Sequence, residues 1–219
     1  MKKTILIVGA IVVIILLAGI YKFNFTNDDI YVKDPEGKSI PPIDEAKDIS
    51  KNTDSKEFKT KTGKIIIITE THPVGQSISS ITITTKGFKE NKLIELSDID
   101  PIEKIELKDL DNDGFEEIYL FTRSVGSGSG GDFYVYGSDK DDRLMEYEKE
   151  KLDEKEYLKG GRLEGYMGHD TYFFDQQMLV MEFPIYKEND ANLKPTGGTK
   201  KVYYMLNQSK LKIKKIDIN

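Results

Sequence analysis

The sequence contains no cysteine, only two histidines, and fewer basic than acidic residues, and each of these shortages excludes a class of function. Without cysteine there can be no disulfide bonds, no thiol catalysis, no thiolate metal ligands and no cysteine-linked lipid. His72 and His169 are far apart in the chain and form no pair at helical spacing, so the sequence offers no zinc site of that kind.

The deficit of basic residues argues against a nucleic-acid partner. Without Lys2, Lys3 and Lys22, 29 of the 32 basic residues remain against 38 acidic ones, a net charge of about −9. Binding to phosphates needs a basic face, which this composition does not favour. An acidic surface suits attraction to a basic protein partner, although the same charge also serves solubility alone.

The N-terminal residues 1–22 carry the one long apolar stretch of the sequence. Lys2 and Lys3 precede a run over residues 4–20 that is about the minimum length for a membrane span. The end of this run offers no convincing A-x-A cleavage site, so we favour a membrane anchor over a cleaved signal peptide. The basic start places the rest of the chain outside the cytoplasm, either anchored or, if the segment is cleaved, periplasmic.

Residues 23–62 are rich in polar residues and contain Pro35, Pro41 and Pro42, so they are predicted to be a flexible tether. From residue 63 onward the character changes to short segments rich in β-branched and aromatic residues, separated by turn signals. The predicted strands are Ile65–Ile68, Ile78–Thr85, Lys92–Leu96, Glu103–Leu107, Glu116–Arg123, Asp132–Tyr136, Thr171–Phe174, Met178–Phe183, Lys201–Leu206 and Leu211–Ile216.

Many short strands with few helical stretches predict an all-β fold, a single antiparallel β-sandwich domain over residues 63–219. The domain is long enough to bury a core without disulfides. The charged segment 139–160 interrupts the pattern and is compatible with a long hairpin, a short helix or a flexible excursion.

The acidic segment 109–117, DLDNDGFEE, places carboxylates at spacings that suit calcium. The twelfth position, where an EF-hand requires glutamate, is Leu120, and the flanks read as strands, so an EF-hand is excluded. A strand–loop–strand calcium site remains, with an acidic β-turn as the alternative. Its candidate ligands are Asp109, Asp111, Asp113 and Glu117.

The stretch 122–136, TRSVGSGSGGDFYVY, joins two predicted strands through a glycine- and serine-rich loop. It lacks the Gly-Lys-Ser/Thr ending of a phosphate-binding loop and the G-x-S-x-G pattern of a serine hydrolase. Carboxylates are too numerous in this chain to specify an active site, and a lone histidine is more often structural, so an enzyme is the weakest interpretation. A glycine-rich hairpin tip can instead enter a cleft with its backbone groups exposed, or it can simply be a solvated loop.

The blocks DLDNDGFEE (109–117), TRSVGSGS (122–129), GYMGHD (165–170), FPIY (183–186), DAN (190–192) and PTGG (195–198) together resemble the periplasmic inhibitors of invertebrate-type (I-type) lysozyme. The resemblance spans most of residues 64–206 and depends on the joint order of the blocks. It implies a β-sandwich that inserts a Ser-Gly loop into the substrate cleft of the lysozyme, with no cofactor required.

Carried onto this chain, the inserting loop is Ser127–Gly131, and Ser127 matches the serine of the family motif. The family has a tyrosine shortly after that serine, where this chain has Gly130; the nearest aromatics are Phe133, Tyr134 and Tyr136. Loss of one buried aromatic anchor can cost ~2 kcal/mol or more of binding energy. The predicted inhibitory residues are Ser127, Gly128, Ser129, Gly130, Gly131 and Phe133, with His169 and Asp170 in a supporting turn.

The favoured interpretation is therefore a membrane-tethered, extracytoplasmic inhibitor of I-type lysozyme or a related cell-wall hydrolase. The alternative is a calcium-stabilised binding or adhesion module without inhibitory activity, in which the acidic loop carries a structural calcium ion. The sequence leaves open whether the domain forms a homodimer.

Overall fold

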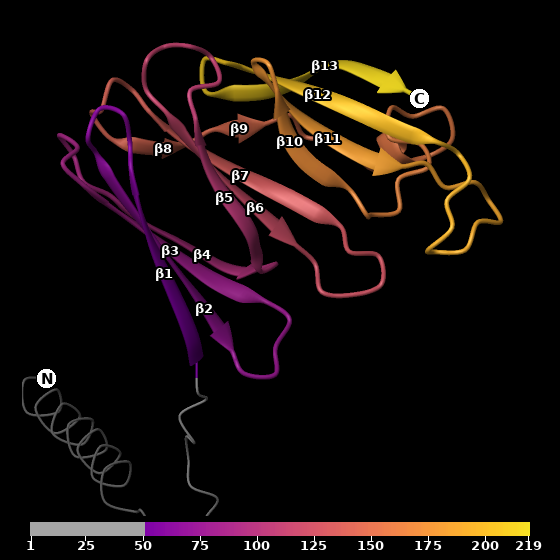
Figure 1. The fold of residues 1–219 in the computed structure, drawn as a ribbon, viewed down its shortest axis with the longest axis horizontal. Coiled ribbons are helices and arrows are strands. Elements are labelled where there is room, and N and C mark those ends of the chain that lie inside the picture. The colour runs from indigo at the N-terminus through magenta and orange to yellow at the C-terminus, as the bar shows by residue number, and fades with distance from the viewer. Residues whose placement is uncertain (1–50) are drawn as a thin grey trace, which may run out of the picture. The chain divides into compact units, whose positions relative to one another are not determined.

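The computed structural model describes residues 51–219, and the predicted anchor 1–22 and the first part of the predicted tether lie outside the described residues. Within the described residues, no helix is long and apolar enough to cross a membrane. The fold over this range is built from strands in three sheets (Figure 1), and its one helical element is the short 3-10 helix η1 (Glu154–Tyr157).

The first sheet is an antiparallel meander in which each strand pairs with the next one in sequence. On β2 and β3 the isoleucines at alternate positions are buried, while the intervening residues face outward. This alternation is what a sheet with one solvated face requires. Its strands are β1 (Lys51–Lys59), β2 (Ile65–Pro73), β3 (Ser79–Lys86) and β4 (Leu93–Ile99).

The middle sheet is a second antiparallel meander and carries the glycine-serine loop between two of its strands. Its strands are β5 (Ile102–Lys108), β6 (Glu117–Arg123), β7 (Gly131–Ser138) and β8 (Leu144–Glu146). The third sheet is antiparallel except for one short parallel pair, β13 with β9. In spatial order it consists of β10 (Thr171–Asp175), β11 (Met178–Pro184), β12 (Thr199–Asn207), β13 (Lys210–Ile218) and β9 (Glu148–Lys149).

The middle sheet lies between the other two and is covered on both faces (Figure 1). Along β6, Ile118 and Leu120 belong to the core shared with the first sheet. Tyr119 and Phe121 belong to the core shared with the third sheet, where Phe121 packs 5.5 Å from the ring of Tyr172. Consecutive side chains of a strand point to opposite faces, so a strand buried on both faces needs consecutive apolar residues, which residues 118–121 of β6 provide.

The predicted all-β antiparallel fold is confirmed, and each of the ten predicted strands overlaps a strand of the structure. The predicted single β-sandwich is replaced by three sheets, with the middle one covered on both faces, which the strand pattern did not reveal. The tether prediction is wrong for residues 51–59, because they form β1 and pair with β2. β1 is an edge strand whose side chains from 52 onward are exposed apart from half-buried Phe58, so it lacks the apolar pattern that marks the other strands.

The charged segment 139–160 is an ordered crossing between sheets. It completes the middle sheet with β8, adds β9 to the third sheet, and then forms η1. Arg162 fixes its end, because its guanidinium donates to Glu156 and Glu150, each at 2.8 Å. These two hydrogen bonds raise the pKa of Arg162.

Because β6 contributes to both cores, damage to either face of this strand should destabilise the whole domain. We expect Leu120→Ala, on the face toward the first sheet, to cost about 2–5 kcal/mol of unfolding free energy. Phe121→Ala, on the opposite face, should cost about 3–5 kcal/mol. Urea unfolding of the full-length chain, followed by circular dichroism, should show a single transition shifted in both variants. Leu93→Ala, whose side chain is 61% exposed, is the control and should change stability little. Two separate transitions, with only one moved by each variant, would contradict this coupling.

Candidate interaction site at the β6–β7 loop

The glycine-serine loop, residues 124–130, connects β6 to β7 and closes the hairpin that the sequence predicts. Residues 125–128 are exposed, and Ser124, Ser129 and Gly130 are half-buried. The hairpin is closed by a hydrogen bond from Ser124 N–H to the Gly130 carbonyl at 2.9 Å. The tip therefore projects from a strand whose other end is fixed in the core.

The backbone carbonyls of this loop are held by three separate parts of the protein. Asn192 Nδ2 donates to the Ser127 carbonyl at 2.6 Å, and His169 N–H donates to the Gly128 carbonyl at 3.1 Å. Arg123 Nη1 donates to the Ser129 carbonyl at 2.7 Å. The acceptors from Ser127 to Gly130 are thus all engaged within the chain.

The backbone donors of the same loop differ from its acceptors. In the part of the chain that the structure describes, no hydrogen bond engages the N–H groups of residues 125–130. Each non-proline residue carries one donor and one acceptor, and the two kinds of group are used here in opposite ways. Within the described residues, the tip therefore has engaged acceptors and unengaged donors.

Arg123, at the end of β6, is the residue that ties the loop to its surroundings. Its Nε and Nη2 donate to the carboxylate of Glu103 on β5, both at 2.8 Å. Nη2 also donates to the backbone carbonyl of Asp170 at 2.8 Å. The hydrogen bonds to Glu103 raise the pKa of Arg123, and paired guanidinium–carboxylate geometry is stronger than a single neutral hydrogen bond.

Asp170 fixes the point where the loop enters β7. Its side chain is buried, and Oδ1 accepts from Gly131 N–H at 2.8 Å and from the Tyr166 hydroxyl at 3.0 Å. A side chain at position 131 would collide with Asp170 Oδ2 and with the Tyr172 ring, so the approach requires glycine there. The structure thus places His169 and Asp170, the predicted supporting turn, directly against the loop.

The other predicted loop residues differ in what they can contact. Ser127 and Gly128 are exposed at the tip. A side chain at Gly130 would lie 3.3 Å from the Tyr166 hydroxyl, so this position is close to the supporting turn. The prediction that Phe133 contacts a partner is wrong, because its side chain is 3% exposed and packs against Tyr172 and Tyr204 in the core.

Of the aromatic residues nearest the loop on β7, none takes the place of the absent tyrosine at the tip. Tyr136 is fully buried, and Tyr134 is half-buried on β7. The exposed apolar side chains near the loop are instead aliphatic: Val125 on the loop, Met167 in the supporting turn, and Leu193 beside Asn192. These residues and Arg123 were not predicted as site residues. Arg123 and Val125 lie in the block 122–129 of the resemblance, Met167 lies in the block 165–170, and Leu193 directly follows the block 190–192.

The acidic loop lies at the opposite end of β6, before the strand begins. Asp109, Asp111 and Asp113 each place a carboxylate oxygen within 4.8 Å of the others. Some of these oxygens accept backbone N–H groups, including Gly114 N–H to Asp109 at 3.2 Å and Phe115 N–H to Asp113 at 2.8 Å. Asp109 Oδ1, in contrast, is buried without a hydrogen-bond partner among the described residues. The cluster thus has a vacant acceptor, which is compatible with a cation.

Glu117 does not belong to this cluster of three carboxylates. It is 1% exposed, and its carboxyl accepts from Leu110 N–H at 2.9 Å beneath the acidic loop. Burial, reinforced by the charges of Asp111, Asp113 and Asp109, raises the pKa of Glu117 to about 8. Its place in the structure is therefore that of a support for the loop, and not of the fourth ligand that the sequence predicted.

The two histidines have partners other than the loop serines. Among the described residues, His169 pairs with Asn192 at 3.4 Å and His72 with Ser79 at 2.9 Å, and neither imidazole contacts Ser127 or Ser129. A serine nucleophile needs a base within hydrogen-bond reach.

Comparison of the chain with family models, with curated proteins and with solved structures finds no match.

Contact between the supporting turn and the loop can be tested at Gly168. A Cβ there would lie 1.8 Å from the Gly128 carbonyl oxygen, and the residue has φ +86°. Gly75 has nearly the same φ, +80°, but no atom within 4 Å of a Cβ. Gly75→Ala should cost about 1–2 kcal/mol of unfolding free energy from backbone strain alone. Gly168→Ala should cost about 1–3 kcal/mol more from the clash. Equal losses in urea unfolding would show that the turn does not hold the loop.

Proposed function

We propose that this protein inhibits I-type lysozyme by inserting the glycine-serine loop into the substrate cleft of the enzyme. The observation that carries the proposal is the division of backbone groups at the tip: carbonyls of residues 127–130 are bound within the protein, while N–H groups of residues 125–130 have no hydrogen-bond partner among residues 51–219. The resemblance of the sequence blocks to the lysozyme inhibitors is the reason for proposing this class of enzyme as the target.

A glycosidase cleft supplies the acceptors that this tip lacks. The enzyme uses a pair of carboxyl groups flanking the scissile bond, and at least one of them is ionised. Free N–H groups and the Ser127 hydroxyl can donate to such a carboxylate, giving charge-assisted hydrogen bonds. The inhibition is competitive, because the loop occupies the space of the substrate, and it involves no covalent step and no cofactor.

Preorganisation makes this mode of binding favourable for a loop that lacks the aromatic residue of the family. Binding costs free energy when a loop becomes ordered, and that cost falls when the loop is already held in one conformation. Here Asn192, His169 and Arg123 hold the loop in the free protein. Val125, Met167 and Leu193 add apolar contact area around the tip.

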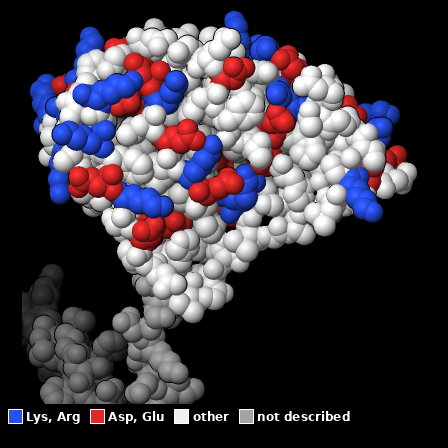
Figure 2. Space-filling model, in the orientation of Figure 1, with Lys and Arg blue, Asp and Glu red and all other residues white. Residues whose placement is uncertain are grey.

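Electrostatics around the tip agree with insertion into a cleft. Figure 2 shows basic and acidic side chains mixed over most of the visible face, whereas the lower edge, where the β6–β7 loop lies in Figure 1, is free of them. A neutral tip avoids burying an unpaired charge. The excess of acidic residues over the whole chain would accelerate encounter with a basic lysozyme.

The setting of this activity follows from the N-terminal sequence. We propose that residues 4–20 hold the protein at the outer side of the cytoplasmic membrane, where the domain protects the cell wall from a hydrolase. A cleaved segment would instead release it into the periplasm, with the same inhibitory loop.

Two substitutions at the tip test the proposal. The assay measures how the full-length chain, in a mild detergent, inhibits hydrolysis of purified peptidoglycan by I-type lysozyme. Ser127→Ala removes a donor to a charged group, worth about 1.5 kcal/mol or more, and should weaken inhibition about tenfold. Gly128→Ala should also weaken inhibition, since its methyl group would obstruct the cleft. In the free protein that Cβ meets only the Met167 carbonyl oxygen, at 3.8 Å, so folding should be unaffected.

Ser80→Ala, an exposed serine on β3, is the matched control and should leave inhibition unchanged. Melting temperatures of all three variants establish that each is folded. Inhibition that is insensitive to both tip substitutions would remove the loop from the mechanism, and absence of inhibition by the folded wild-type chain would exclude the function.

We further propose that the acidic loop binds a structural calcium ion, which the alternative function, a calcium-stabilised binding or adhesion module, also requires. The supporting observation is the partnerless Asp109 Oδ1 beside the carboxylates of Asp111 and Asp113. Partial desolvation and the charges of Asp113 and Asp109 raise the pKa of Asp111. Asp109, Asp111 and Asp113 would hold the ion and stiffen the start of β6.

Calcium at 10 mM should raise the melting temperature by about 5 °C, as expected for an extracellular-type site with a dissociation constant of roughly 0.1–1 mM. The double variant Asp111→Asn/Asp113→Asn should lose this shift and, without calcium, should be no less stable than the wild type, because repulsion is relieved. Asp139→Asn, an exposed residue outside the cluster, is the control. An equal calcium shift in the double variant would exclude the site.

A further inference from the structure

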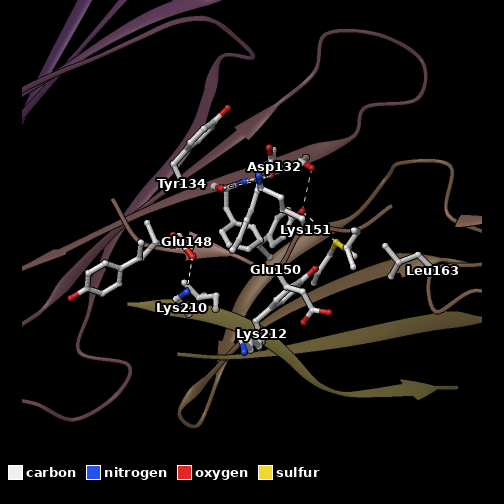
Figure 3. Close-up of a pocket in the computed structure, with 18 of the residues that line it drawn as sticks. Asp132, Tyr134, Glu148, Glu150, Lys151, Leu163, Lys210 and Lys212 are labelled. Atoms are coloured by element: carbon white, nitrogen blue, oxygen red, sulfur yellow. Dashed lines mark hydrogen bonds and ion pairs between the residues drawn. The ribbon is translucent and has the colours of Figure 1, made fainter. Parts of the chain in front are cut away.

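A cavity of about 980 Å³ lies at the edge of the sandwich, next to the first half of β7. Figure 3 shows Asp132 and Tyr134 of β7 on one side of this cavity, across from Lys210 and Lys212 of β13. The segment 146–152, which crosses from the middle sheet to the third, forms part of its wall. The cavity is separate from the tip of the glycine-serine loop, although Gly131, Tyr166 and Tyr172 border both.

The interior of the cavity is apolar and aromatic. Phe133, Leu163, Tyr172, Tyr204 and Leu211 contribute buried side chains to its lining. Tyr157 and Tyr166, whose rings lie 5.8 Å apart, add two further rings. Small-molecule sites are concave, mostly apolar and about 300–1,000 Å³ in volume, and this cavity has those properties.

The exposed edge of β7 beside the cavity is not open for another strand. Gly131 uses its N–H with Asp170 at 2.8 Å and its carbonyl with the Tyr172 hydroxyl at 3.2 Å. The Phe133 carbonyl accepts from Lys149 at 3.4 Å, and the Val135 carbonyl accepts from Tyr147 N–H at 2.8 Å. Addition of a peptide strand needs free backbone groups at a sheet edge, so the cavity is suited to a small ligand that contacts side chains.

The rim of the cavity carries charges of both signs, and the lysines are in excess once pairs are formed. Lys149 pairs with Asp132, and Lys210 pairs with Glu148 at 3.0 Å. Glu150 is engaged by Arg162 and by the N–H of Ile213. Within residues 51–219, the lining groups outside any ion pair are two ammonium groups and one carboxylate: Lys151, Lys212 and Glu146.

We propose that this cavity binds a small amphipathic anion whose apolar or aromatic ring body lies among the tyrosine and phenylalanine rings. Its anionic group lies at the rim, against Lys151 and Lys212. Ring faces favour flat apolar or aromatic bodies, and the unpaired ammonium groups favour a negative over a neutral head. This site is independent of lysozyme inhibition, because its ligand does not contact residues 125–128.

The test uses 2-naphthoate and its neutral analogue 2-naphthamide, which share one ring system and differ in charge. Isothermal titration of the full-length chain in a fixed concentration of non-ionic detergent measures both affinities. We expect one site per chain, with the naphthoate bound about tenfold more tightly than the amide. Lys151→Gln/Lys212→Gln should lower the naphthoate affinity to that of the amide and leave the amide unchanged. Lys155→Gln/Lys194→Gln, two exposed lysines outside the lining, is the matched control.

A second variant distinguishes the cavity from other apolar parts of the chain. Leu163→Trp places a larger side chain in the lining and should abolish binding of both probes, with circular dichroism establishing that the variant is folded. Unchanged binding in folded Leu163→Trp, equal affinities for the two probes, or no effect of the lysine substitutions would each overturn the proposal. If Leu163→Trp does not fold, the comparison of the two lysine pairs still decides the outcome.

Discussion

Burial of β6 on both faces is the constraint on which the rest of this structure depends. Ile118 and Leu120 face one core, while Tyr119 and Phe121 face the other, so the strand joins three sheets into one unit. The acidic loop precedes this strand and the glycine-serine loop follows it. A strand fixed so firmly can hold a short loop in a defined position, and both candidate sites use that property.

At the glycine-serine loop, a few buried or half-buried polar groups set the direction of the backbone. Arg123 and Asp170 engage a carbonyl and an N–H at the base of the loop, and Asn192 holds the carbonyl of Ser127. The free N–H groups are the complement of this arrangement. In the proposed function, satisfied acceptors and unsatisfied donors fit the tip to an acidic cleft, and the acidic composition of the chain would affect the rate of encounter and not the contact itself.

Much of the fold could be predicted from the sequence, since alternation and β-branched runs marked ten strands. β1 was missed because the edge segment 51–59 is mostly exposed and polar, like a tether. Phe133 was predicted as a loop residue because it lies close to Ser127 in the sequence. Closeness in sequence does not tell to which face of β7 the Phe133 side chain points. Glu117 has the spacing of a ligand, but the preceding backbone directs it into the core, where it accepts from Leu110 N–H. The carbonyls of the tip are engaged by segments about 40 and 65 residues away, as in the hydrogen bond from Asn192 to Ser127. No local sequence pattern encodes these distant contacts.

The most direct test of the account is amide hydrogen exchange at Gly126, Ser127 and Gly128, with and without I-type lysozyme. We predict rapid exchange of all three amides in the free protein, because they have no acceptor among residues 51–219, and marked protection once the lysozyme is bound. Chicken-type lysozyme at the same concentration provides the comparison for selectivity. Amides already protected in the free protein, or amides that exchange equally fast when the I-type enzyme is saturating, would contradict the claim that these donors bind its cleft.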